Sequence, residues 1–291
     1  MAVFGNLLKR KESSFRNCKL ELFFHILICL LFINATSAQG DLLIFPKRIV
    51  FDGGKRVKQI ILSNIGKDTA VYNVSFRQYR MNEYGVFQVI TEPNVSQHFA
   101  TPFLRVFPRK VTLAPNESQT VKVQLTKTTK LKVGEYRSHL YFRAEKNNKP
   151  LGQKESLVDS TSISVKLEAV FGISIATIIK KGTSNTVVAI SNLFYEKDKD
   201  LNHFLNFTIN RKGNMSTYGD IYISYISSNN TTYEVGKVKG VAVYTPGEVR
   251  KVKMQLKLPE GVSFIGGTFK VAYTVNESKE IVAEAELQFK L

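Results

Sequence analysis

Hydrophobic and polar residues alternate along most of the chain after residue 41, in short runs rich in β-branched and aromatic side chains. Glycine, asparagine, aspartate and proline close these runs. A period of two is typical of β-strands with one buried face, and the period of an amphipathic helix is almost absent. The pattern predicts strands most clearly at residues 57–63, 70–80, 85–91, 119–126, 135–144 and 162–175.

The run 135–143 has the clearest alternation. Because successive side chains of a strand point to opposite faces, the two faces can be written down directly. One carries Tyr136, Ser138, Leu140 and Phe142, and the other carries Arg137, His139, Tyr141 and Arg143. We expect the first face to lie in a core and the second to be in contact with water. Strands at this spacing, separated by turn signals, indicate antiparallel sandwiches.

The second half of the chain repeats features of the first at matching spacing. Pro115, Glu117 and the run 121–125 match Pro246, Glu248 and the run 252–256. Three weaker matches accompany them: Ser63-Asn64 with Ser191-Asn192, residues 73–76 with 206–209, and residues 134–136 with 267–269. The repeat predicts two copies of one sandwich.

Leu131, Gly134 and Tyr136 have the spacing of a tyrosine corner, in which a phenol closes a strand crossover in immunoglobulin-like domains. An ordinary core tyrosine is the alternative. The predicted fold class is therefore all-β, with two tandem immunoglobulin-like antiparallel β-sandwich domains. We place them at residues 39–176 and 177–291, because Gly172 and the run 180–182 separate the last strand of one copy from the next.

Residues 1–38 are typical of an export signal. A basic stretch that includes Lys9, Arg10 and Lys11 precedes an apolar run at residues 22–33, which is short for a membrane span. Small residues at 36–38 suit cleavage; an uncleaved anchor is the alternative. Both cysteines, Cys18 and Cys29, lie in this segment, so the mature chain has no disulfide. No second membrane span follows.

The chain carries 41 Lys and Arg against 24 Asp and Glu, a net charge of +17. Residues 1–38 hold five of the basic and two of the acidic residues, which leaves 36 against 22. Such a charge favours acidic partners, although general solubility also accounts for it. Export and the lack of an RNA-binding aromatic motif argue against nucleic acid as a partner.

The sequence offers little for catalysis. His98, His139 and His203 are scattered without metal-ligand spacing, and we interpret them as surface or turn residues. No nucleophile elbow or phosphate-binding glycine loop occurs. Glu196, Asp198 and Asp200 could hold calcium, but Lys197 and Lys199 between them favour a solvated loop. We therefore expect no enzyme activity, no metal, no cofactor and no small-molecule substrate.

Four segments, in order, resemble the PapD-like periplasmic chaperones of pilus and fimbrial assembly. Residues 47–53 resemble the first strand of that family, and residues 103–115 the segment that leads into its fifth strand. Residues 136–143 are similar to the sixth strand, and residues 165–173 to the last strand of the first domain. The resemblance covers about residues 41–180, and the second domain is supported mainly by the internal repeat.

The resemblance implies two immunoglobulin-like domains with a pilus subunit held against the cleft between them. In that family an arginine of the first strand and a lysine of the last strand bind the subunit's terminal carboxylate. These positions map onto Arg48 and Lys166. Two cations at a partly desolvated cleft give charge-assisted hydrogen bonds to one carboxylate.

The family's last strand also carries large alternating apolar residues that pair with the subunit as an added strand. Positions five, seven and nine residues before Lys166 are Thr161, Asp159 and Leu157, and of these only Leu157 fits. Ile163 and Val165 alternate correctly but lie closer to the lysine. Either the register differs through an insertion near residues 146–155, or subunit capping is changed or lost.

The sequence is best explained as a periplasmic chaperone that binds and caps exported pilus, fimbrial or related surface subunits by β-strand addition. Arg48 and Lys166 are the expected carboxylate anchors, and Leu157, Ile163 and Val165 the expected strand-pairing residues. Two alternatives stay open: a structural or adhesive surface protein, and a binder of acidic glycans. A secreted or surface location is the alternative to the periplasm.

Overall fold

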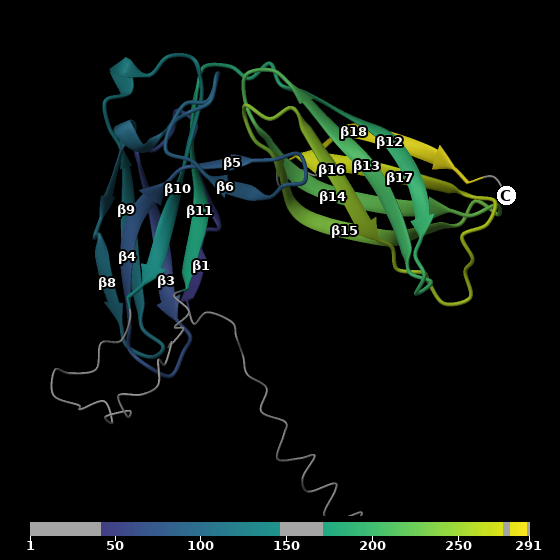
Figure 1. Cartoon of the computed structure of the whole chain (residues 1–291), viewed down its shortest axis with the longest axis horizontal. Coiled ribbons are helices and arrows are strands. Elements are labelled where there is room, and N and C mark those ends of the chain that lie inside the picture. Colours follow the sequence, from purple (N-terminus) through teal and green to yellow (C-terminus); the bar gives the residue numbers. More distant parts are fainter. Residues whose placement is uncertain (1–41, 146–170, 276–279, 290–291) are drawn as a thin grey trace, which may run out of the picture. The chain divides into compact units, whose positions relative to one another are not determined.

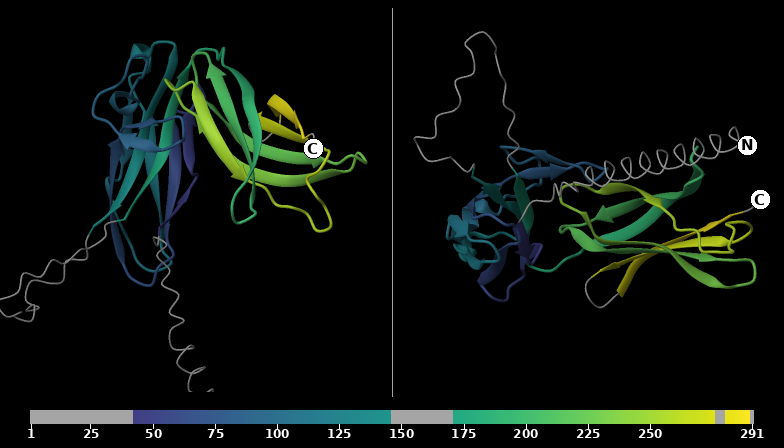
Figure 2. Two further views of the ribbon diagram at one scale, coloured as in Figure 1. Left: turned by 45° about the vertical axis from the view of Figure 1, so that its right-hand side comes forward. Right: turned by 90° about the horizontal axis from the view of Figure 1, so that it is seen from below.

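A computed structural model describes residues 42–145, 171–275 and 280–289 of the 291-residue chain (Figure 1 and Figure 2). These residues form β-strands and two single-turn 3-10 helices, η1 (Thr101–Phe103) and η2 (Thr128–Lys130). No helix in these ranges is long and apolar enough to cross a membrane. The predicted all-β class with two tandem immunoglobulin-like sandwiches is confirmed. The predicted signal at residues 1–38 lies outside the described residues.

The first sandwich consists of a four-stranded and a five-stranded sheet. The four-stranded sheet has, in spatial order, β1 (Leu42–Phe45), β3 (Val57–Asn64), β9 (Ser118–Leu125) and β7 (Leu104–Phe107). The five-stranded sheet has β2 (Arg48–Phe51), β11 (Gly172–Lys181), β10 (Gly134–Ala144), β4 (Ala70–Arg77) and β8 (Lys110–Leu113). Apolar side chains of both sheets meet in one core, among them Phe51, Leu62, Val121 and Phe142.

The second sandwich is built in the same way from a three-stranded and a four-stranded sheet. The smaller sheet has β12 (Val187–Lys197), β13 (His203–Lys212) and β16 (Val249–Gln255). The larger has β15 (Thr232–Val243), β14 (Thr217–Ile226), β17 (Thr268–Val275) and β18 (Glu280–Gln288). Their facing side chains form a second core that includes Phe207, Tyr225, Phe269 and Tyr273.

A separate hairpin, β5 (Tyr79–Met81) and β6 (Phe87–Val89), follows β4. The side-chain oxygen of Asn82 accepts the N–H groups of Tyr84 and Val86, which closes the hairpin turn. The turn touches β16, where the ammonium of Lys251 lies 2.8 Å from the Glu83 carboxylate. Next to it a small third core joins the hairpin to both sandwiches through Met81, Ala176, Ile178, Ala242 and Tyr244.

The structure confirms one half of the alternation predicted for β10 and corrects the other. Tyr136, Leu140 and Phe142 are buried in the first core, as expected. On the opposite face, Arg137 and His139 are only 3% and 4% exposed, so the expectation of a wet face is wrong there. The hairpin and the second sandwich cover this face, and alternation alone does not reveal a second covering layer.

The tyrosine corner predicted at Tyr136 is present. The phenolic oxygen of Tyr136 accepts the backbone N–H of Lys132 at 3.0 Å, and its hydroxyl faces the Lys132 carbonyl at 3.4 Å. This ties the start of β10 to the chain just upstream, as the motif does in immunoglobulin-like domains.

The later matches of the internal repeat join equivalent strands of the two sandwiches, but the earlier matches join strands that are not equivalent. β9 and β16 occupy equivalent places, since the N–H of Asn64 donates to Glu117 and that of Arg211 donates to Glu248. The counterpart of Asn64 is therefore Arg211 at the end of β13, and not Asn192 in β12. Residues 73–76 lie in β4 of the five-stranded sheet, whereas residues 206–209 lie in β13 of the three-stranded sheet. Alternating strands resemble one another too closely for sequence spacing to separate them.

β11 is the last strand of the first sandwich. It pairs antiparallel with β10 over residues 172–181 and parallel with β2 over residues 176–179. The strand predicted at residues 162–175 meets it only at residues 172–175, and the rest of that prediction lies outside the described residues. The domain boundary after residue 176 falls within β11 and stays a prediction.

Candidate binding site

Arg48 begins β2, which runs parallel to the second half of β11. Ile49 and Phe51 point into the first core, so the alternation of the strand directs Arg48 to the opposite face of the sheet. Arg48 pairs with Ala176, and Ala176 pairs with His139 on β10. The three residues therefore form one row across three adjacent strands, on the face away from the core.

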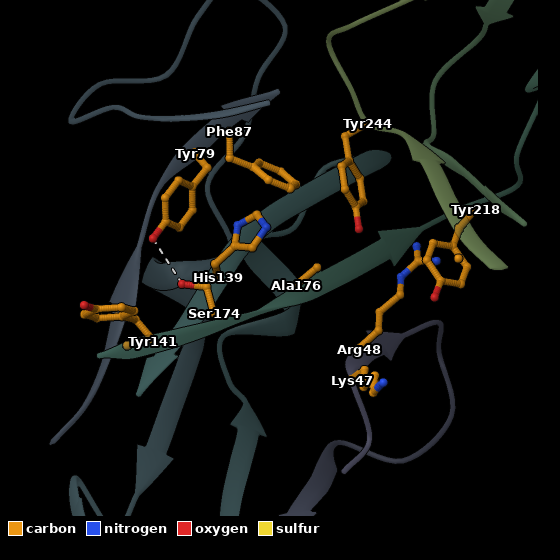
Figure 3. Close-up of a pocket in the computed structure, with 12 residues that line it drawn as sticks. Lys47, Arg48, Tyr79, Phe87, His139, Tyr141, Ser174, Ala176, Tyr218 and Tyr244 are labelled. Carbon is orange, nitrogen blue, oxygen red and sulfur yellow. Dashed lines mark hydrogen bonds between the residues drawn. The ribbon is translucent and has the colours of Figure 1, made fainter. Parts of the chain in front are cut away.

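A cavity of about 400 Å³ lies over this row (Figure 3). Its walls come from the five-stranded sheet, the β5–β6 hairpin and the facing part of the second sandwich. The lining residues are Lys47, Arg48, Tyr79, Phe87, His139, Tyr141, Gly172, Ser174, Ala176, Tyr218, Gly240 and Tyr244. A volume of this size is at the lower end of the range of about 300 to 1,000 Å³ found for ligand pockets.

The cavity has a cationic end. The guanidinium of Arg48 lies 4.2 Å from the centre of the Tyr218 ring, and Lys47 lines the same wall. The Nε atom of Arg48 is buried and has no hydrogen-bond partner among the described residues. None of the described residues that line the cavity is acidic. The cavity is thus suited to an anion, which would supply both the missing hydrogen-bond acceptor and the missing negative charge.

The other end of the cavity is aromatic. The His139 ring lies 4.9 Å from the centre of the Tyr79 ring and 5.2 Å from that of Phe87, both in edge-to-face contact. Burial, and to a lesser extent the nearby Arg137 charge, lowers the pKa of His139 to about 3. At neutral pH the ring is therefore uncharged, and it acts as one more aromatic surface.

One side of β11 is unpaired next to the cavity. The Ala144 N–H donates to the Phe171 carbonyl, and hydrogen-bonded pairs alternate in an antiparallel ladder. The backbone N–H and C=O groups of Ile173 and Ile175 therefore point toward β10. Those of Gly172 and Ser174 point to the other side of the strand. There the pairing with β2 begins only at Ala176, so among the described residues no strand covers this edge. A free strand edge can accept another strand.

Next to the cavity, a cluster of polar groups from both sandwiches is satisfied by hydrogen bonds within the cluster. The Glu135 carboxylate of β10 accepts the backbone N–H of Ser216 at 2.8 Å and the Thr245 hydroxyl at 3.1 Å, and it also contacts the Ser216 hydroxyl. Next to it, Arg137 donates to the Thr245 carbonyl at 3.2 Å and stacks over Tyr244. These groups bind each other, and neither Glu135 nor Arg137 lines the cavity.

Of the five predicted site residues, one lies in the described part of the chain and four lie outside it. Arg48 lies in the cavity, while Lys166, Leu157, Ile163 and Val165 lie outside the described residues, so their roles stay predictions. Sequence reasoning missed Lys47, His139 and Phe87 as cavity residues. The basic pair 47–48 was visible in the sequence, but no signal in it reveals that the hairpin folds over β10.

Two further residues singled out in the sequence, His139 and Asp198, have contacts within the chain itself. His139 was expected at the surface and is buried, because the hairpin covers it. The carboxylate of Asp198, a calcium candidate from the sequence, accepts the backbone N–H groups of Asp200 and Asn202 and so closes its own loop. No cluster of three metal-ligating side chains occurs in the described part of the chain.

No protein-family model and no curated protein matches the sequence. Solved structures do match. The CupB2 chaperone of Pseudomonas aeruginosa is 11% identical over 85% of this chain and 100% of its own, with a TM-score of 0.41. The class 5 fimbriae chaperone CfaA is 18% identical over 85% and 98%, with a TM-score of 0.38. The Salmonella enterica SafA pilin in complex with the SafB chaperone is matched at 10% identity over 87% and 98%, with a TM-score of 0.40.

Many of the structures that match are thus chaperones of pilus and fimbrial assembly, the family that the sequence resembles. Identities of 10–18% and TM-scores near 0.4 assign no role to any residue of this chain. The role of each residue has to be inferred from the contacts of its own side chain.

Proposed function

We propose that this protein is a chaperone of exported pilus, fimbrial or related surface subunits, which it binds by its first sandwich. One observation carries the proposal. Within the part of the chain that the structure describes, the buried Nε of Arg48 has no partner, no acidic residue lines its cavity, and the neighbouring edge of β11 at residues 172–174 pairs with no strand. An extended polypeptide that ends in a carboxylate complements both features at once.

The carboxylate of the client's last residue binds the Arg48 guanidinium. Hydrogen bonds between ionised groups are stronger than neutral ones, and the half-buried position of Arg48 reduces competition from water. Lys47 adds a second positive charge on the same wall. Lys166 remains the proposed second anchor from the sequence resemblance.

The residues before the client's terminus then add a strand to β11. Gly172 and Ser174 offer their backbone groups to it, and the ladder continues toward the proposed pairing residues Val165, Ile163 and Leu157. Such pairing covers the client's own unsatisfied edge and prevents premature assembly. We propose that this takes place in the periplasm after removal of residues 1–38, without catalysis and without a cofactor.

The test is recovery of the client from the host that exports this chain. The full chain, tagged at its C-terminus, is purified from the periplasm as wild type, as Arg48→Gln and as Arg105→Gln. Arg105 is an exposed arginine of β7 outside the cavity and serves as the matched control. We expect a small β-rich exported subunit in stoichiometric amount with the wild type and Arg105→Gln, and its loss with Arg48→Gln.

Recovery of the protein alone from all three strains contradicts the proposal and favours a structural or adhesive surface protein. Recovery of an acidic glycan, with affinity that falls steeply as salt is added, favours the glycan binder instead. Equal recovery of a subunit with Arg48→Gln contradicts the carboxylate anchor.

A further inference from the structure

The aromatic end of the cavity is not required to hold a carboxylate. A cation and a free strand edge suffice for the proposed function, yet the wall opposite Arg48 carries the rings of Tyr79, Phe87, His139 and Tyr244 (Figure 3). The exposed fraction of Phe87 is 44%, although its ring packs 5.9 Å from that of Tyr79. A large apolar side chain held open at a cavity is a surface that a ligand can cover.

The distance between the cationic end and the aromatic end of the cavity is comparable to the length of one large residue. Arg48, Ala176 and His139 lie on three neighbouring strands, which are spaced about 4.8 Å apart, so the two ends are about 10 Å apart at the backbone. The side chain between them is the small methyl group of Ala176, which also lines the cavity. The long side chain of a residue whose carboxylate lies at Arg48 is therefore of the right size to reach the aromatic wall.

The aromatic wall also contains an unsatisfied polar atom. His139 is 4% exposed, and its Nδ1 has no hydrogen-bond partner among the described residues. The ring is held in place by edge-to-face contacts with Tyr79 and Phe87. The wall is thus a set of rings packed edge to face, and it suits a flat side chain, which prefers such edge and offset contacts.

We propose that the cavity selects its clients by an aromatic residue at their C-terminus. The terminal carboxylate binds Arg48, and the terminal ring packs against Phe87, Tyr79 and His139. This inference rests on the proposed function, and it adds the chemistry of the residue that is recognised. It assigns the hairpin β5–β6 a role in specificity, because the hairpin supplies two of the rings.

The experiment compares three fluorescein-labelled dodecapeptides that share an alternating apolar sequence and differ at the last residue. One ends in phenylalanine with a free carboxylate, one in alanine with a free carboxylate, and one in phenylalanine amide. Fluorescence anisotropy of each is measured against the exported full chain. We expect the phenylalanine acid to bind about tenfold or more tightly than the alanine acid, and the amide to bind most weakly.

Two variants assign the preference to the hairpin. Phe87→Ala is expected to reduce the phenylalanine preference to about twofold, while the affinity for the alanine acid stays the same. Val89→Ala is the matched control, because Val89 is an exposed apolar residue of the same strand that does not line the cavity. It is expected to keep the full preference. The peptide series on the wild-type chain tests the inference even where a variant fails to fold.

Two results separate this inference from the proposed function. Equal binding of the phenylalanine and alanine acids, both weakened by Arg48→Gln, overturns the aromatic preference and leaves the carboxylate anchor standing. Equal binding of acid and amide overturns both. Displacement of the phenylalanine peptide by free 3-phenylpropanoate at the same concentration as by unlabelled peptide also overturns the inference, because the cavity would then be a small-molecule site.

Discussion

Two regions on the outer face of the five-stranded sheet contain polar or charged side chains and differ in how these are satisfied. Around Glu135 and Arg137, the carboxylate receives hydrogen bonds from Ser216 and Thr245, and the guanidinium donates to Thr245. Around His139 and Arg48, residues of both sandwiches line a cavity of about 400 Å³, and no acidic residue of the described ranges lines it. The Glu135–Arg137 region holds the two sandwiches together, and the region of His139 and Arg48 leaves room for a ligand.

The difference teaches how a structural contact is told from a binding site in this protein. An unpartnered atom is not sufficient, because Arg137 also has a buried Nε without a hydrogen-bond partner in the described ranges. Arg48 is set apart by the cavity beside it and by the free edge of β11 next to that cavity. Substitutions in the first region should therefore change stability, and substitutions in the second should change binding.

The largest effect is expected in the closed region. Glu135→Gln removes a buried negative charge that accepts several hydrogen bonds and lies near the charges of Arg137, Lys180 and Arg211. We expect the free energy of unfolding to fall by about 3 kcal/mol. Urea denaturation measures it. Glu234→Gln, at an exposed position, is the control and should stay within about 0.5 kcal/mol of the wild type. A loss as small as that of the control would show that the two regions are energetically alike.

The open region should show the opposite behaviour. Arg48→Gln removes the charged donor of the cavity, and we expect client-peptide affinity to fall by about 10- to 100-fold, since a hydrogen bond to a charged group contributes about 1.5–3 kcal/mol. Its urea midpoint should stay close to that of the wild type. Titration calorimetry with the same peptide measures the affinity, with Arg105→Gln as control. A variant that loses stability and keeps its affinity contradicts the assignment.

The pH dependence of stability tests the burial of His139. Its folded pKa of about 3 is below the value of about 6.5 expected for the unfolded chain, so the unfolded state binds the proton first as the pH falls. The free energy of unfolding should therefore decrease by about 2 kcal/mol between pH 7 and pH 5. Urea denaturation at both pH values measures the drop, and His139→Gln should make it smaller. An unchanged drop in the variant would mean that other groups cause it.

The smallest effect concerns one backbone group. Ser174→Pro removes an N–H that points to the free edge of β11, and the ladder with β10 does not use it. We expect client-peptide affinity to fall about fivefold, the value of one neutral hydrogen bond. Ser174→Ala removes the contact of the hydroxyl with Tyr79 but keeps the N–H, so it separates the two effects. Equal losses in both variants would point to the side chain and argue against strand addition.

Local patterns predicted most of the strands, whereas Arg48 was singled out by the resemblance to the chaperone family. Alternation placed β3, β9 and β10 within one or two residues of their ends, and the spacing of Tyr136 predicted its hydrogen bond to Lys132. The same pattern could not show that His139 is buried, because alternation describes one strand and its core face. The covering hairpin and the second sandwich come from distant parts of the chain, and no spacing in the sequence records their contact.

The most direct test of the central claim is amide hydrogen exchange along β11, measured by NMR with and without a saturating client peptide. In the free protein the amides of Ile173 and Ile175 should exchange slowly, since they face β10, while those of Gly172 and Ser174 should exchange fast. Strand addition predicts that the client slows exchange at Gly172 and Ser174 and leaves Ile173 and Ile175 as they were. Unchanged fast exchange at Gly172 and Ser174 with the client bound would contradict strand addition at this edge.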